Sequence, residues 1–261
     1  MAEQKETVAE ARTDTKTVIK ENERLDDLQI SGLFIIQDTK RFCFGMDAVL
    51  LSGFVSIKDG AKVLDMGTGT GILPLLLSAK TKASKLTGLE IQPESADMAR
   101  RSVEYNRTVL QDRVEIVEGD IKEAGSIFGP ASFDVVTCNP PYMKKGNGLV
   151  NPDEALAIAR HELMCTFDDV SREATKVLTP GGKLFLVHKP ERLSELLCTL
   201  TKYKLEPKRV RVVYPYADKE PEMVLIEAAK GGKSGMKMEK PLIIFEKSGE
   251  YTEEIKRDYR F

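Results

Sequence analysis

The chain has 261 residues, 41% hydrophobic and 31% charged, a balance typical of soluble globular proteins. Its formal net charge of −2 gives no global attraction to nucleic acid, so any RNA site must be a local patch. The four cysteines are scattered and the two histidines isolated, which predicts neither a metal site nor a disulfide framework and favours reduced thiols in a cytosolic protein. No apolar run is long enough to span a bilayer and no signal peptide is evident, so we expect no membrane contact.

The N-terminal residues predict a tail followed by one domain. Residues 1–22 contain few large apolar side chains, so burial cannot offset the entropy of ordering them and a flexible tail is expected. One domain over residues 23–261 should follow. An apolar cluster at residues 33–37 predicts a short strand or hairpin, with Phe44 as a packing residue. A helix should begin near Asp47, where a capping role is the simplest explanation.

A glycine-rich turn follows the first long apolar strand, residues 62–65. Its sequence, Gly67-Thr68-Gly69-Thr70-Gly71, puts glycine at alternate positions and leads into an apolar helix from Ile72. Glycines let the backbone turn sharply and approach a ligand where a Cβ would collide. The spacing differs from the Gly-x-Gly-x-x-Gly of dinucleotide-binding proteins, and the acidic Asp65 precedes the first glycine by two residues.

The next two strands also end in acidic residues. Glu90 ends the strand at residues 86–89, where a carboxylate can accept hydrogen bonds from ribose hydroxyls; a solvated glutamate is the alternative. Ile91 comes directly after it. Asp120 and Ile121 follow the strand at residues 114–117, and a capping role for Asp120 stays open.

A fourth strand, residues 133–137, leads into Cys138-Asn139-Pro140-Pro141-Tyr142. Two prolines cannot donate to a sheet ladder, so the strand should end here with Asn139 at its carboxyl end. The side-chain oxygen of Asn139 and the carbonyl of Pro140 can accept both hydrogens of a planar amino group, and the Tyr142 ring can stack on the group's carrier. Strands alternating with helical stretches predict an α/β, Rossmann-like, doubly wound and mostly parallel sheet.

The second half of the chain adds helices, strands and the basic residues. We expect a helix over residues 167–178 that ends at Pro180-Gly181-Gly182, a buried strand over 183–188, and a helix over 189–200. A basic strand and a strand over 223–228 should follow, then a short helix from Thr252. The candidate RNA contacts, for which plain solvent exposure is the alternative, are Lys144, Lys145, Arg160, Lys208, Arg209 and Arg211.

The Asn139-to-Tyr142 motif resembles that of S-adenosylmethionine-dependent methyltransferases acting on exocyclic or amide nitrogens, and the glycine turn resembles the first motif of class I methyltransferases. Over residues 24–260 the chain resembles the bacterial tRNA adenine-N6 methyltransferases that act next to the anticodon of a valine tRNA. This resemblance rests on the segments 24–28, 42–48, 139–142, 160–162, and 240–245 with 250–252. The first and the last of these lie outside the generic methyltransferase core and carry the narrower assignment.

The resemblance implies S-adenosylmethionine as cofactor, tRNA as partner, and an antiparallel strand pair that closes the sheet. Asp65 would steady the cofactor's methionine end, and Asp120 would bind its adenine amino group, with Ile121 packing on the ring. Residues from Phe42 to Asp47 would help close the cofactor pocket, and Asn139, Pro140, Pro141 and Tyr142 would be catalytic. The full set of implied cofactor contacts is Phe44, Asp47, Asp65, Gly67, Thr68, Gly69, Gly71, Glu90, Ile91, Asp120, Ile121 and Asn139.

Two other functions remain open at this point. A release-factor glutamine methyltransferase shares the same motif but usually carries an extra helical domain, for which residues 1–60 leave little room. A non-catalytic RNA-binding protein on this fold would predict a broken glycine turn or a replaced Asn139, and neither is present.

Overall fold

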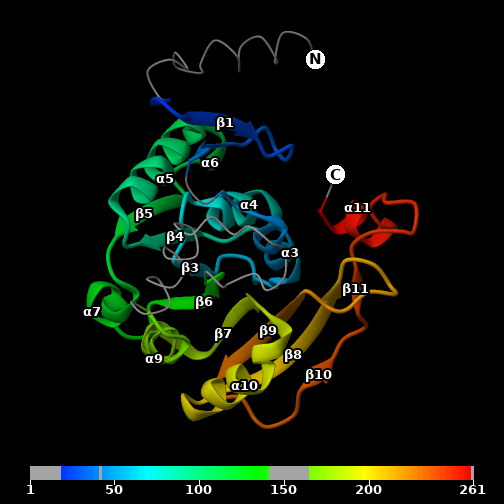
Figure 1. Cartoon of the computed structure of the whole chain (residues 1–261). Helices are drawn as coiled ribbons and strands as arrows, with labels where there is room; N and C mark the ends of the chain where they lie inside the picture. Colours follow the sequence, from blue (N-terminus) through cyan, green and yellow to red (C-terminus); the bar gives the residue numbers. More distant parts are fainter. Residues whose placement is uncertain (1–18, 41–42, 141–164, 260–261) are drawn as a thin grey trace.

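The computed structural model describes residues 19–40, 43–140 and 165–259, and it has the expected α/β architecture, with a mostly parallel sheet between helical layers (Figure 1). The predicted tail therefore lies almost entirely outside the described residues. In the described part, the parallel strands lie in the spatial order β7-β6-β3-β4-β5. Their bounds are β3 (Lys62–Met66), β4 (Lys85–Glu90), β5 (Val114–Glu118), β6 (Phe133–Cys138) and β7 (Leu178–His188).

An antiparallel strand pair extends the sheet beyond β7, as the family resemblance implies. The strand β9 (Met223–Lys230) runs antiparallel to both β7 and β8 (Leu205–Tyr214). Two strands that the sequence does not predict as separate elements, β10 (Lys237–Met238) and β11 (Leu242–Ile243), pair parallel with β8. Strands of two residues are too short for an alternation pattern to reveal them.

Helices cover both faces of the sheet. Apolar side chains of α3 and α4 form one core cluster with the sheet, and those of α9 and α10 form a second cluster. These two layers bury both faces, as parallel sheets require. The helix bounds are α3 (Met46–Phe54), α4 (Ile72–Lys80), α5 (Pro93–Tyr105), α6 (Arg107–Leu110), α7 (Ala124–Phe128), α9 (Phe167–Val177), α10 (Leu193–Lys202) and α11 (Glu253–Tyr259), with 3-10 turns η1 (Ile121–Glu123) and η2 (Pro190–Arg192).

One predicted boundary is wrong. The sequence places a turn at residues 180–182 and starts the strand at Lys183, whereas β7 already begins at Leu178. The chain enters the sheet through an irregularity in its pairing with β6. A Cβ on Gly182 would lie 2.9 Å from the Thr179 carbonyl oxygen and 3.1 Å from that of Asp134, so glycine permits this close backbone approach.

A separate hairpin of β1 (Glu23–Asp27) and β2 (Phe34–Asp38) docks on α5 through side chains. Asn106 accepts a hydrogen bond from the Phe34 N–H at 2.9 Å and donates to the Phe34 carbonyl at 2.6 Å. Ser102 accepts from the Ile36 N–H at 2.9 Å. The amide and hydroxyl thus satisfy backbone groups at the buried edge of β2.

Replacing Asn106 by alanine should lower the free energy of unfolding by about 1–3 kcal/mol, because the N–H and carbonyl of Phe34 would lose their partners. Urea denaturation followed by circular dichroism measures this change. Glu104→Ala is the matched control, since Glu104 is exposed on the same helix and its ion pair with Arg107 is exposed too. Equal losses in both variants would contradict the docking role of Asn106.

Candidate active site

The glycine turn connects β3 to α4 at the carboxyl end of the sheet. Gly67 and Gly69 have φ angles of 74° and 57°, in the left-handed region that favours glycine. The N–H groups of Gly67 and Thr68 both donate to the Leu89 carbonyl, at 2.9 and 3.0 Å, which ties the turn to β4. The turn is therefore held in one conformation. The backbone at Gly69 is open on the side of the missing Cβ, because no described residue lies within 4 Å of a Cβ placed there.

Asp65 is a buried carboxylate beneath this turn. Its side chain is 2% exposed, and Oδ1 accepts a hydrogen bond from the Thr137 hydroxyl on β6 at 2.7 Å. Within the described residues, neither its buried Oδ2 nor the buried hydroxyl oxygen of Thr68 makes a well-formed hydrogen bond, although the Thr68 hydroxyl is close enough to lower the pKa of Asp65. Burial is the main cause that raises the pKa of Asp65 to about 6; the Thr137 and Thr68 hydroxyls lower it, and the nearby Glu90 carboxylate adds a smaller upward contribution. A buried carboxylate with a free oxygen is suited to bind a cationic group.

Glu90, at the end of the neighbouring strand β4, holds the glycine turn through a hydrogen bond. It is 6% exposed, and its two carboxylate oxygens accept hydrogen bonds from the backbone N–H groups of Gly69 at 2.8 Å and Gln92 at 2.9 Å. Glu90 is therefore a fixed group rather than the solvated glutamate of the alternative reading. Ile91, directly after it, is 37% exposed at the same edge of the sheet.

Asp120 and Ile121 follow β5 at the same edge. The Asp120 side chain accepts from the Lys122 N–H at 2.9 Å and so caps η1, which is the alternative role that its sequence position left open. Ile121 reaches the glycine turn, since its Cδ1 would lie 3.6 Å from a Cβ on Gly67. The structure thus brings the ends of β3, β4 and β5 together. Of the two residues after β5, Ile121 approaches the glycine turn, whereas the contact described for Asp120 is with Lys122.

Asn139 directly follows β6, which ends at Cys138 as predicted. Its Oδ1 is buried and has no hydrogen-bond partner among the residues that the structure describes. Because β6 and β3 are neighbours and Met66 pairs with Cys138, the Asn139 amide lies beside the glycine turn. Phe42, Pro141, Tyr142, Lys144, Lys145 and Arg160 lie outside the described residues.

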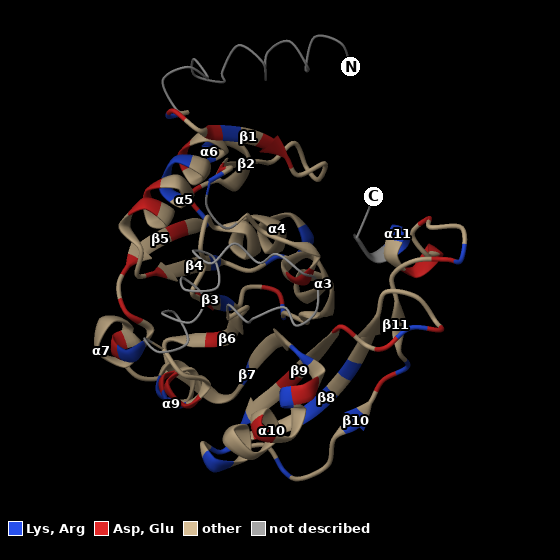
Figure 2. Ribbon diagram, viewed as in Figure 1, with Lys and Arg blue, Asp and Glu red and all other residues tan. Residues whose placement is uncertain are grey.

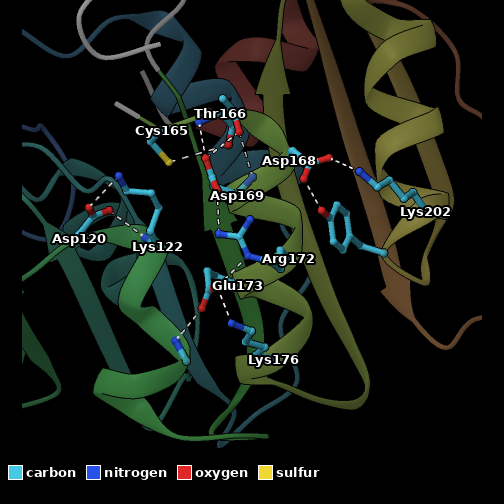
Figure 3. Close-up of polar contacts among 12 residues, drawn as sticks. Asp120, Lys122, Cys165, Thr166, Asp168, Asp169, Arg172, Glu173, Lys176 and Lys202 are labelled. Carbon is cyan, nitrogen blue, oxygen red and sulfur yellow. Dashed lines mark hydrogen bonds and ion pairs between the residues drawn. The ribbon is translucent and has the colours of Figure 1, made fainter. Parts of the chain in front are cut away.

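The chain re-enters the described part at Cys165, beside the Asp120 segment (Figure 3). Thr166 and Asp169 form a reciprocal capping box that starts α9. Glu173 accepts from the Gly125 N–H of α7 at 3.1 Å, so α9 is fixed against α7. Burial raises the pKa of the Cys165 thiol to about 11 and that of Cys138 well above its usual value, so neither thiol is ionised at neutral pH.

The predicted basic residues of β8 all have partners within the fold. Arg209 pairs with Glu227 on β9 and with Glu239, and Figure 2 shows such opposite charges side by side on β8 and β9. Arg211 pairs with Glu254 of α11 at 2.6 Å. Lys208 donates to the carbonyls of Lys233 and Gly235. These side chains hold the edge of the sheet together, and a role in RNA binding stays a prediction.

Two predicted pocket residues lie near α3, and one site residue was missed. Phe44 donates its N–H to Gln37 and packs against the core, while Asp47 accepts from the Ala48 N–H in the first turn, one residue inside the helix start. Their predicted role in closing a pocket is not tested by these contacts.

The sequence analysis did not single out Thr137, whose hydroxyl holds Asp65. The available signal was a lone hydroxyl in an apolar strand, one residue before Cys138.

A family described as a methyltransferase domain matches residues 57–240. A tRNA1(Val) (adenine(37)-N6)-methyltransferase of Porphyromonas gingivalis is 32% identical over 189 residues, covering 70% of this chain and 72% of the relative. The chain belongs to this methyltransferase family. A relative of the same name from Tolumonas auensis is 28% identical over 222 residues, covering 85% of this chain and 90% of the relative.

The fold of this methyltransferase agrees with that of solved relatives. A crystal structure from Agrobacterium tumefaciens, described as a predicted O-methyltransferase, has a TM-score of 0.68 and 25% sequence identity and covers 82% of this chain and 96% of that one. In the described residues, no helix has the length and apolar character needed to cross a membrane, and no three metal-ligating side chains converge.

The cofactor of this family is S-adenosylmethionine, and the residues present fit it. The buried, unpartnered Oδ2 of Asp65 and hydroxyl of Thr68 can serve a cationic, hydrogen-bonding group. The open backbone at Gly69 leaves space for a ligand against the turn. The Oδ1 of Asn139, without a partner among the described residues, lies at the adjacent strand end.

Proposed function

We propose that the chain methylates the N6 amino group of an adenine in tRNA, and that this is adenine 37 of tRNA1(Val), the nucleotide named for its relatives. The observation that carries the proposal is the buried Asn139 Oδ1 beside the glycine turn, which has no hydrogen-bond partner in the part of the chain that the structure describes. An amide oxygen there can accept a hydrogen bond from an amino group. Because its proposed substrate is a tRNA, we also propose that the enzyme acts in the cytoplasm.

The cofactor site is assigned to the strand ends of β3, β4 and β5. Asp65 binds the methionine amine with its free Oδ2, and Glu90, fixed by Gly69 and Gln92, accepts from the ribose hydroxyls. Asp120 keeps acceptor capacity beyond its cap and takes the adenine amino group, with Ile121 against the ring. When bound, S-adenosylmethionine supplies a methyl group on a sulfonium, which is already an activated leaving group.

The acceptor site is assigned to the segment after β6. The N6 lone pair of adenine is delocalised into the ring, which makes the amino group a poor nucleophile. Hydrogen bonds from N6 to the Asn139 Oδ1 and the Pro140 carbonyl favour a pyramidal nitrogen whose lone pair is available. The two residues also fix the direction of the amino group, so they act by alignment and electrostatics, and no general base is needed. Tyr142, outside the described residues, is the proposed stacking partner of the flipped base.

The reaction is tested by incubating the protein with S-adenosylmethionine and tRNA that lacks its modifications. After digestion of the RNA, mass spectrometry should detect N6-methyladenosine, and mapping of the fragments should place it at position 37 of the valine tRNA. Methyl groups on a release-factor glutamine, with none on tRNA, would move the protein to the alternative enzyme class. Binding of tRNA without methylation of any substrate would favour the non-catalytic reading.

Cofactor affinity should depend on pH through Asp65. The carboxyl has a raised pKa of about 6, and a bound amine favours its ionised form, so cofactor binding should lower that pKa and release protons near pH 6. The dissociation constant should be nearly constant close to pH 7 and should rise toward about tenfold per pH unit as the pH falls below 6. Isothermal titration calorimetry between pH 5 and 7 in buffers of different ionisation enthalpy measures both effects. A flat profile in the wild-type protein would contradict the role of Asp65.

A further inference from the structure

A groove lies at the carboxyl end of β8, apart from the cluster of Asp65, Glu90 and Asn139. It has a volume of about 520 Å³, in the range of small-molecule sites, and it lies between the turn after β8 and the turn after β11. Phe245 holds the two segments together, because its N–H donates to the Pro215 carbonyl at 2.9 Å and its backbone bridges to Tyr251. The groove is therefore built by the fold rather than by loose loops.

Aromatic rings form one wall of this groove. The Tyr216 and Phe245 rings have centroids 5.4 Å apart at 33°, and the Phe245 and Tyr251 rings are stacked at 5.1 Å. Tyr216 and Phe245 line the groove and are only partly buried. Partly buried aromatic rings in a row can form a stacking surface for another planar group.

Charged side chains at the groove narrow the choice of ligand. Asp218 and Glu246 line it together with Lys247. Two carboxylates against one ammonium disfavour a phosphate, but a carboxylate accepts hydrogen bonds from an exocyclic amino group. A nucleobase with an amino group can stack on the aromatic rings and donate hydrogen bonds to the carboxylates.

The groove also lies on the same edge of the sheet as the proposed reaction site. His188, at the end of β7, pairs through β9 with Val212, so β8 ends on the side where β6 ends at Cys138. Three strand spacings separate β8 from β6, about 14 Å across the sheet, and the groove lies further outward. Figure 1 shows β11 and α11 beyond this end of β8. One RNA loop can therefore reach both places.

We propose that the groove formed by Tyr216, Phe245, Asp218 and Glu246 binds a second, unmethylated nucleobase of the tRNA, several nucleotides from the target adenine. This inference rests on the proposed function. The second contact fixes the RNA loop on the sheet edge while the target base is unstacked, so the groove contributes to RNA affinity and not to the chemical step.

The test uses the full-length protein and an unmodified valine tRNA transcript. Tyr216→Leu and Phe245→Leu keep apolar volume but remove the rings, and each should raise the dissociation constant and KM for tRNA about tenfold, with kcat at saturating tRNA and cofactor affinity unchanged. Tyr105→Leu is the matched control, because Tyr105 is also a partly buried tyrosine against a phenylalanine, Phe34, on a different part of the molecule. Thermal melts establish that each variant folds.

Ultraviolet crosslinking gives an independent readout in the wild-type complex, where a tRNA nucleotide should be attached to a peptide containing Tyr216 or Phe245. If the wild-type protein methylates tRNA and both groove variants keep the wild-type KM for tRNA, this inference is wrong and the proposed function stands. Failure of the wild-type protein to bind and methylate any tRNA would overturn both.

Discussion

Replacing Asn139 by alanine should lower kcat for tRNA methylation by about 100- to 1,000-fold and leave the dissociation constant for S-adenosylmethionine nearly unchanged. The reason is that the buried Oδ1 of Asn139 has no partner within the described protein and is free to accept from the substrate amino group. Its removal takes away a contact that orients the amino group and makes its lone pair available, whereas the cofactor residues on β3 and β4 stay in place. Single-turnover kinetics with saturating tRNA, together with calorimetric titration of the cofactor, separate the two effects.

Asn139→Asp is the informative companion variant. It keeps an acceptor oxygen at the same position, so it should retain more activity than Asn139→Ala even though it adds a charge. If cofactor binding disappears together with activity in the alanine variant, Asn139 has a structural role and the assignment fails.

The change Asp65→Asn should have two effects of opposite sign. At pH 7 the dissociation constant for S-adenosylmethionine should rise at least about 30-fold, because the buried partner of the cationic amine is lost. The cofactor-free protein should become more stable, by up to about 3 kcal/mol, because burial penalises the ionised carboxylate. A raised pKa means that this penalty is absent near pH 4 and complete above pH 6, so the gain in stability should shrink as the medium is acidified.

Thermal melts of the cofactor-free protein at pH 4.5 and pH 7, with calorimetry of cofactor binding, measure both effects of Asp65→Asn. Asp134→Asn is the matched control, since Asp134 lies at the opposite end of the sheet, is exposed, and accepts from the Lys62 N–H, as an amide oxygen also can. An Asp65→Asn protein that binds the cofactor as wild type does would remove Asp65 from the site.

The order of strands and helices could be predicted because local patterns fix it. The apolar runs that become β3, β4, β5 and β6 are bounded by glycine, proline or polar residues, and each was predicted to within about two residues. The start of β7 was missed because Pro180 and Gly181 normally end an element, whereas here β6 pairs with Leu178 before them and with Lys183 after them, across a shift in register. The two-residue strands β10 and β11 likewise exist only through pairing with β8.

The sequence by itself determined the chemical groups of the site, because the carboxyl ends of parallel strands meet at one edge and the residues there can be read in order. Asp65, Glu90 and Asn139 were placed at that edge in this way. Only the tertiary structure decided which of their atoms are already used. Glu90 is held by two backbone N–H groups, whereas Asp65 and Asn139 each keep a buried oxygen that no described residue hydrogen-bonds. Such partners come from other strands and turns, here Thr137 and Gly69, and hydrogen bonding between segments distant in sequence leaves no periodic signal within either of them.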